Sequence, residues 1–200
     1  RQPALLMAVF CGMAAYGSMN LVMSVTPPAM MGHDHGFAGA AFVIQWHVLA
    51  MFAPSFFTGH LIHRLGVRPI LAAGAVMMLA CVGVNLSGTG MVQFAVALVL
   101  LGLGWNFLFV GATTLVTELH DGSEKAKVQA ANDVLVFGTV AVTALASGYI
   151  FDTLGWTAVN VAVVPPLVIA LTAILLVPKP AREDAPESAS AGGEADQPAQ

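Results

Sequence analysis

The chain has 200 residues, of which 58% are hydrophobic and only 9% are charged, with a mean hydropathy of +0.81. An average soluble domain has roughly 25% charged residues, so this composition excludes an ordinary soluble protein and indicates an integral membrane protein. The formal net charge of -4 argues against a nucleic-acid-binding function.

Long uncharged segments alternate with short polar turns along the chain. The first apolar segment ends at Pro27-Pro28, and a polar turn at residues 33–36 separates it from the second. Residues 69–117 contain no Asp, Glu, Lys or Arg, and as one helix they would extend about 73 Å, more than twice a bilayer. The chain must therefore turn back, and residues 85–90 have the composition of a turn. Six membrane spans follow, at residues 4–30, 40–62, 70–86, 91–117, 134–151 and 157–177.

Two further features appear in the second half of the chain. Pro165-Pro166 lies in the sixth span and predicts a kink, because proline lacks an amide hydrogen and its ring clashes with the preceding turn. Residues 178–200 are rich in Ala, Glu, Asp, Ser, Gly and Pro and contain no aromatic residue, so we expect a disordered tail.

The basic residues predict the orientation in the membrane. If six helices alternate in direction, all seven Lys and Arg residues fall on one side, which the positive-inside rule assigns to the cytoplasm. These residues are Arg1, Arg64, Arg68, Lys125, Lys127, Lys179 and Arg182. We therefore expect a multi-pass protein of the inner (plasma) membrane with both ends of this segment cytoplasmic. Because the chain opens with Arg1 in place of Met, we also interpret it as a segment of a longer protein.

A short pattern occurs twice. Gly-x-Leu-x-His-Arg-x-Gly at residues 59–66 recurs as Gly-x-Ile-x-Asp-Thr-x-Gly at residues 148–155, and the copies close the second and fifth spans. This predicts two units of three helices each. Because three is odd, the second unit enters the membrane from the opposite face, as in the inverted repeats of secondary transporters.

The first copy and the residues after it, 59–68, resemble the hairpin motif GxLxDRxGRR of the major facilitator superfamily. Residues 148–156 are similar to the turn before that superfamily's last helix. The resemblance covers residues 4–177 and implies an all-α fold that is the C-terminal six-helix half of a twelve-helix transporter, with the N-terminal half missing. The motif positions to which it assigns geometry, topology and gating are Gly59, Arg64, Gly66, Arg68, Gly148, Asp152 and Gly155. Two departures are His63 in place of the motif Asp and Val67 in place of a basic residue, and the lost carboxylate removes the charge pairs of that position.

Polar residues inside the spans are the candidate substrate ligands, because a transporter site of this kind lies near the bilayer midplane. The candidates are Asn20, Gln45, His47, Trp105, Asn106 and Thr113. For Asn20 and Asn106 two interpretations stay open, a substrate ligand or an interhelical hydrogen bond. Trp46 is interpreted as an interfacial anchor. Small residues four apart, Ala8 with Gly12 and Ala144 with Gly148, predict close helix packing.

No acidic residue lies at mid-membrane. Glu118 and Asp133, at the inner ends of the fourth and fifth spans, are the candidates for proton coupling, although the main coupling carboxylate is expected in the missing half. His33, Asp34 and His35, with His47, allow a metal-binding alternative. We expect no metal and no cofactor.

The predicted function is secondary active transport of a small molecule across the lipid bilayer by alternating access, coupled to protons. No catalytic motif is present, so an enzyme is not predicted. Two rival hypotheses are a membrane scaffold or sensor without transport activity, and a metal carrier that uses the outer histidines.

Overall fold

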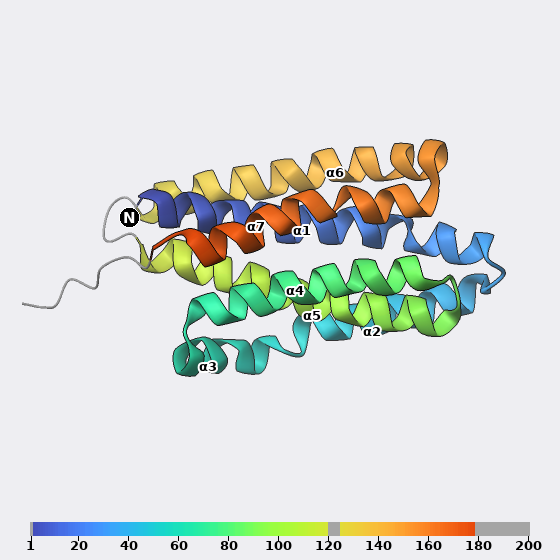
Figure 1. Ribbon diagram of the computed structural model, residues 1–200, viewed down its shortest axis with the longest axis horizontal. Helices are drawn as coiled ribbons and strands as arrows, with labels where there is room; N and C mark the ends of the chain where they lie inside the picture. Colours follow the sequence, from blue (N-terminus) through green and yellow to red (C-terminus); the bar gives the residue numbers. More distant parts are fainter. Residues whose placement is uncertain (1, 120–124, 179–200) are drawn as a thin grey trace, which may run out of the picture.

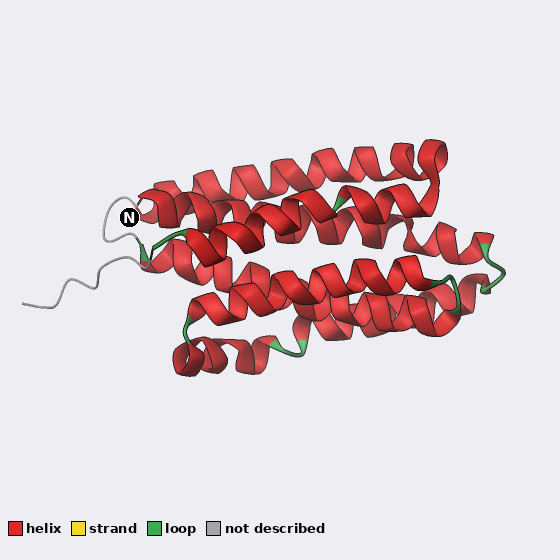
Figure 2. Cartoon of the chain, viewed as in Figure 1, coloured by secondary structure: helices red, strands yellow, loops and turns green. Residues whose placement is uncertain are grey.

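The computed structural model describes residues 2–119 and 125–178, and every regular element within them is a helix (Figure 2). The helices are α1 (Gln2–Gly32), α2 (Gly36–Phe52), α3 (Ser55–Leu65), α4 (Val67–Ser87), α5 (Met91–Glu118), α6 (Lys125–Ala162) and α7 (Val164–Leu176). Helices suit an apolar chain, because backbone N–H and C=O groups in hydrocarbon must bond within their own segment. The predicted disordered tail, apart from Pro178, lies outside the described residues.

Four helical stretches of the described chain are long and apolar enough to cross a membrane, or up to five if the bent pair α2 and α3 forms one span. Three of them, α1, α4 and α5, cover the ranges predicted for the first, third and fourth spans. The fourth stretch combines α6 and α7 in 52 residues. As one straight helix it would be about 78 Å long, more than twice the bilayer.

That stretch is interrupted at Gly155, which has non-helical dihedral angles (φ 80°, ψ -179°). Figure 1 shows that the chain reverses near the end of α6, and that α7 runs back toward the end of the bundle where α6 begins. A second, smaller interruption occurs at Val163, two residues before Pro165-Pro166. α6 begins at Lys125, before the start predicted for the fifth span, so its first turns carry charge.

The range predicted for the second span is divided into α2 and α3, which meet at a 42° bend. The break falls at Ala53-Pro54. Proline causes it because the ring has no amide hydrogen for the carbonyl of Ala50, four residues earlier. The hydropathy pattern alone does not predict this break.

The first helix also differs from the prediction. Pro27-Pro28 is expected to end it, but α1 continues through both prolines to Gly32. Prolines are tolerated inside membrane helices where neighbouring helices and hydroxyl side chains satisfy the freed backbone groups. The carbonyls that these prolines leave free belong to Met23 and Ser24, whereas the hydroxyl of the fully buried Thr26 donates to the carbonyl of Val22 at 2.8 Å.

The helices form an elongated bundle around α1 and α5 (Figure 1). The most extensive contact joins α4 and α5, followed by α1 with α6, and α5 also packs on α1 and α2. α7 covers α4 and α1. Because α5 has neighbours on several sides, none of its residues from Ala97 to Val116 is exposed.

Glycines allow the closest approach, between α4 and α5. A Cβ atom added to Gly74 would lie 2.5 Å from the backbone nitrogen of Leu108, and one added to Gly104 would lie 2.9 Å from the carbonyl oxygen of Gly74. The small residues that bring these helices together are therefore different from the predicted ones. A Cβ on Gly12 would make ordinary contact with Val136 at 3.4 Å, and one on Gly148 would meet nothing within 4 Å.

We expect Gly74→Ala to lower the free energy of unfolding by about 1–3 kcal/mol, because the methyl group meets backbone atoms that can move only if α4 and α5 separate. Thermal unfolding in detergent measures the effect. The control is Gly83→Ala on the same helix, where a Cβ meets nothing within 4 Å and alanine's higher helix propensity favours the substitution. Equal melting temperatures for the two variants would contradict the close packing.

Candidate functional site

One face of α1 is left uncovered by the rest of the bundle. Its partly or fully exposed residues recur every three or four positions and include Tyr16, Asn20 and Ser24, which is one stripe along a helix. The remaining sides of α1 pack on α2, α5, α6 and α7. Polar side chains are costly against lipid, so this stripe is the place where water, a ligand or further protein is needed.

An aromatic cluster lies at the middle of this face. The rings of Trp105 and Phe109 on α5 are stacked, with centroids 5.1 Å apart and planes 13° from parallel. Tyr16 on α1 meets both rings edge-on, at 5.3 and 5.2 Å. Phe137 on α6 and Phe52 on α2 extend the cluster. Four helices therefore contribute to one aromatic cluster, at the centre of which Trp105 is only 6% exposed.

Two polar groups with unused hydrogen-bonding capacity belong to the same region. The Asn20 amide donates to the carbonyl of Val140 (3.2 Å) and to the hydroxyl of Thr143 (3.1 Å), both on α6. Its Oδ1 has only a 3.5 Å contact with the Ser24 hydroxyl, so it remains available as an acceptor. The indole N–H of Trp105 is buried without a partner in the described part of the chain.

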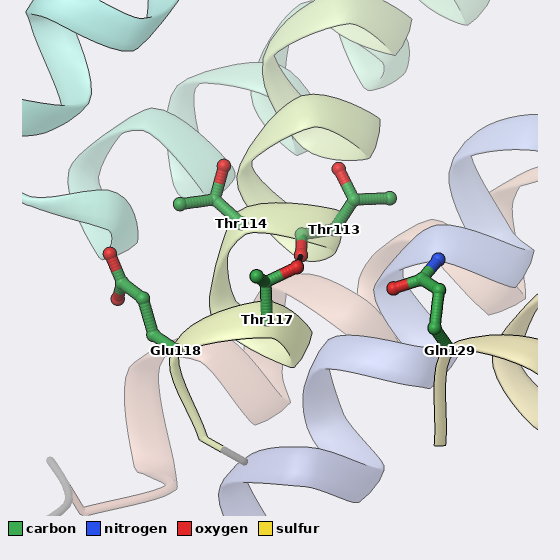
Figure 3. A pocket seen from close by; sticks show the side chains of 5 residues that line it. All are labelled: Thr113, Thr114, Thr117, Glu118 and Gln129. Atoms are coloured by element: carbon green, nitrogen blue, oxygen red, sulfur yellow. Dashed lines mark hydrogen bonds between the residues drawn. The ribbon is translucent and has the colours of Figure 1, made fainter. Parts of the chain in front are cut away.

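The same face of α5 continues toward the inner end of the bundle. Residues four apart share a helix face, so Trp105 and Phe109 are followed by Thr113 and Thr117. Figure 3 shows these threonines in a pocket of about 450 Å³, which Thr114, Glu118 and Gln129 also line. The structure therefore joins two of the predicted site residues, Trp105 and Thr113, along one line.

The two acidic candidates lie close to this pocket. Glu118 lines it from the last turn of α5. Asp133 accepts a hydrogen bond from the Gln129 amide at 2.9 Å, and Gln129 lines the pocket from α6. Both carboxyl groups belong to the inner end of the bundle, and proton coupling through them stays a prediction.

Asn106 points away from the aromatic cluster although it follows Trp105 in sequence. Its side chain is 0% exposed. It donates to the carbonyl of Met51 (2.8 Å) and to the Ser55 hydroxyl (2.7 Å), and the Thr58 hydroxyl donates to its Oδ1 at 2.6 Å. These groups surround the break between α2 and α3. Of the two interpretations left open for Asn106, the structure has the interhelical hydrogen bonds.

Gln45 and His47 lie on different faces of α2. His47 is 0% exposed, and its Nδ1 lies 2.8 Å from the Leu98 carbonyl on α5. A carbonyl only accepts, so Nδ1 carries the hydrogen, and Nε2 is buried without a partner in the described chain. Gln45 is exposed, seven residues before Phe52 and so on nearly the same face. Trp46 is 48% exposed and packs against Phe42.

The outer histidines connect two turns. The Nε2 of His35 lies 2.6 Å from the Thr89 carbonyl in the turn between α4 and α5, and its ring meets Phe94 edge-on. Among the described residues, no group of three His, Cys, Asp or Glu side chains is placed to hold a metal ion. His35 thus ties the turn after α1 to the turn before α5.

The two copies of the repeated pattern end in glycines with similar backbone geometry. Gly66 has φ 88° and ψ 157°, and Gly155 has φ 80° and ψ -179°. Positive φ favours glycine because a side chain would clash there. Of the other motif residues, Arg68 donates to the carbonyl of Pro178 at 2.7 Å. The remaining ones are all exposed, namely Gly59, Arg64, Gly148 and Asp152.

Several residues of this site are not predicted from the sequence. Tyr16, Phe109 and Phe137 do not stand out there, because an aromatic residue in an apolar span is usually packing. The spacing of Trp105 and Phe109, four residues apart, is the signal that could have found the stacked pair. Nothing in the sequence places Tyr16 or Phe137 against them.

Comparisons with known proteins show which family and which relatives this chain resembles. The family model described as Major Facilitator Superfamily matches residues 8–198. The chain is 44% identical over 180 residues to a protein of Brucella anthropi named riboflavin transporter RfnT, and the match covers 90% of this chain and 45% of that protein. It is 33% and 31% identical over 162 residues to YdeG and YddS of Bacillus subtilis, both named uncharacterized MFS-type transporters, covering 80% of this chain and 36% of each. The chain therefore spans less than half the length of these relatives.

We expect Asn106→Ala to lower the free energy of unfolding by about 1–2 kcal/mol, because the Met51 carbonyl and two hydroxyl groups lose their buried partner. Thermal unfolding of the purified protein in detergent measures this change. Gln45→Ala removes an exposed amide from α2 and should leave the melting temperature within error. An unchanged melting temperature for Asn106→Ala would show that the network contributes nothing to stability.

Proposed function

The chain belongs to the Major Facilitator Superfamily, and we propose that it forms half of a membrane transporter whose substrate is a planar aromatic molecule of the riboflavin class. The observation that carries this proposal is the aromatic cluster of Tyr16, Trp105, Phe109 and Phe137. It lies near the midpoints of three helices, where a transporter of this kind holds its substrate. The relative from Brucella anthropi, named a riboflavin transporter, supports the choice of substrate.

The chemistry of the cluster fits such a ring system. An aromatic ring stacks on Trp105 or Phe109 in the way that nucleobases stack on protein aromatics, a contact that contributes about 1–3 kcal/mol. The Asn20 Oδ1 can accept a hydrogen bond from a ring N–H, and the Trp105 indole N–H can donate one to a ring carbonyl. A membrane scaffold and a metal carrier have no comparable support in the described residues.

We propose six spans arranged as two inverted three-helix units. Gly155 divides the 52-residue stretch after Lys125 into two antiparallel parts, and α2 with α3 counts as one bent span. The shared positive φ of Gly66 and Gly155, at equivalent positions of the repeated pattern, supports the internal repeat. These spans add up to the six of a half transporter.

Charge placement supports cytoplasmic ends in an inner membrane. Figure 1 shows the end of α3 and the starts of α4 and α6 at the same end of the bundle. The basic residues of the described chain, Arg64, Arg68, Lys125 and Lys127, belong to these segments. The turns at the opposite end contain none. The positive-inside rule then assigns the basic end to the cytoplasm.

The uncovered stripe of α1, which carries Tyr16, Asn20 and Ser24 among apolar residues, supports a second, N-terminal half in the complete protein. Lipid against Tyr16, Asn20 and Ser24 would be unfavourable, whereas a facing half would enclose them around a midplane site. Rocking of the halves about that site is alternating access. We propose that the proton gradient drives it, with Glu118 and Asp133 at the inner end as secondary groups.

The substrate proposal is tested with Trp105→Leu in the full-length protein. We expect riboflavin affinity, measured by equilibrium binding in detergent, to fall about 5- to 100-fold, because the variant loses its stacking surface. Trp46→Leu, which removes an exposed tryptophan outside the cluster, is the matched control and should bind normally. Equal affinities of the two variants would count against the aromatic site.

Coupling of substrate transport to protons is tested in proteoliposomes with an imposed proton gradient. Accumulation of substrate should stop when a protonophore is added, and Glu118→Gln and Asp133→Asn should each slow uptake by less than about tenfold. Their modest effect is expected because neither carboxyl group lies at mid-membrane. Accumulation that persists with the protonophore would rule out proton coupling.

A further inference from the structure

The pocket at the inner end of α5 lies directly beyond the aromatic cluster. Thr113 follows Phe109 by four residues and Thr117 follows it by eight, so the pocket begins about 6 Å inward along the same helix face. Figure 3 shows Thr113 and Thr117 one above the other on α5 with Gln129 across from them, whereas Thr114 and Glu118 project on the other side. The part adjoining the cluster is therefore formed by Thr113, Thr117 and Gln129.

The hydroxyl hydrogens of these threonines are already used. Thr113 donates to backbone carbonyls of its own helix, at 3.1 Å for Phe109 and 3.0 Å for Val110. Thr117 donates to the carbonyl of Thr113 at 2.8 Å. A hydroxyl oxygen keeps lone pairs after its hydrogen is donated. Both threonines therefore present acceptors to the pocket.

The side-chain amide of Gln129 also presents an acceptor, its oxygen. The Nε2 of Gln129 donates to the Asp133 carboxylate at 2.9 Å, and Figure 3 shows the amide oxygen of Gln129 turned toward α5. Asp133 thus holds the amide so that its acceptor faces the threonines. Figure 3 shows the Thr117 hydroxyl and the Gln129 amide oxygen facing each other across the pocket, whereas the Thr113 hydroxyl points back along α5.

Acceptors alone select a partner that is rich in donors, either a cation or a neutral group with several O–H or N–H hydrogens. The neutral group is favoured, because the opposite charges of Lys125 and Asp133, one helical turn to either side of Gln129, offset each other on this side of α6. The carboxylate of Glu118, which would attract a cation, projects on the other side of α5.

We propose that Thr113, Thr117 and Gln129 form a second subsite, which binds the polyol chain of the substrate while its ring lies among the aromatic residues. This inference rests on the proposed function and adds an orientation to it, with the ring near the midplane and the polyol toward the cytoplasm. One turn of helix separates the two parts, which an extended chain attached to the ring can bridge.

The test compares riboflavin with lumiflavin, which has the same ring but a methyl group in place of the polyol. The full-length protein is used, and binding of each flavin is measured by equilibrium titration. Thr117→Val should weaken riboflavin binding about 5- to 20-fold and leave lumiflavin binding unchanged. Thr117→Ser, which keeps the hydroxyl, should restore riboflavin binding. The matched control is Thr172→Val on α7, where the hydroxyl also donates to its own helix.

The outcomes separate this inference from the function on which it rests. If the wild-type protein binds neither flavin, the proposed substrate is wrong and the subsite assignment falls with it. If the wild-type protein binds both flavins, and Thr117→Val changes the two affinities equally or changes neither, the substrate proposal is retained. The assignment of the polyol subsite is then overturned. Sodium-dependent riboflavin binding that loses its sodium dependence in Thr117→Val would assign the pocket to a cation, which also overturns the proposal.

Discussion

The constraint on which this structure depends is that polar groups inside a bilayer must find partners within the protein, because hydrocarbon offers none. The backbone meets it by forming helices. Polar side chains differ in how completely their hydrogen-bonding groups find partners. The Asn106 side chain makes three hydrogen bonds around the break between α2 and α3. Asn20 keeps an available acceptor on the uncovered face of α1, and the buried N–H of Trp105 has no partner in the described chain. By this difference we interpret Asn106 as a structural residue and keep Asn20 and Trp105 as candidate ligands.

Close packing of α5 makes that separation possible. Glycines at 74 and 104 let α4 approach α5 to backbone contact, and Gly102 allows α2 to approach on another side, where an added Cβ would lie 2.7 Å from the His47 carbonyl oxygen. With these sides occupied, only the face bearing Trp105, Phe109 and Thr113 is directed to α1 and the inner pocket. The helix that carries Trp105 and Phe109 is thus enclosed on several sides, which favours fixed geometry for stacking.

The line from the aromatic cluster to the inner pocket has a chemical gradient. It begins with aromatic rings and a few single hydrogen-bonding groups, and it ends with the oxygen acceptors of Thr117 and Gln129. A molecule with a flat ring and a hydroxylated chain matches this gradient in one direction only. Orientation of a substrate in a transporter can therefore follow from the order of residues along one helix face.

The sequence by itself determined the helical fold, most helix positions and the placement of basic residues at one end, because hydropathy and charge act on each segment separately. It also identified Gly66 and Gly155 as related positions, and its choice of Asn20, Trp105 and Thr113 as substrate ligands stays a prediction. Only the tertiary structure decided that Asn106 is turned from the aromatic cluster, that Tyr16 contacts both Trp105 and Phe137, and that the Gln129 amide oxygen is turned toward α5. These contacts depend on which helix faces meet, and residues on different helices leave no local sequence pattern that records their contact.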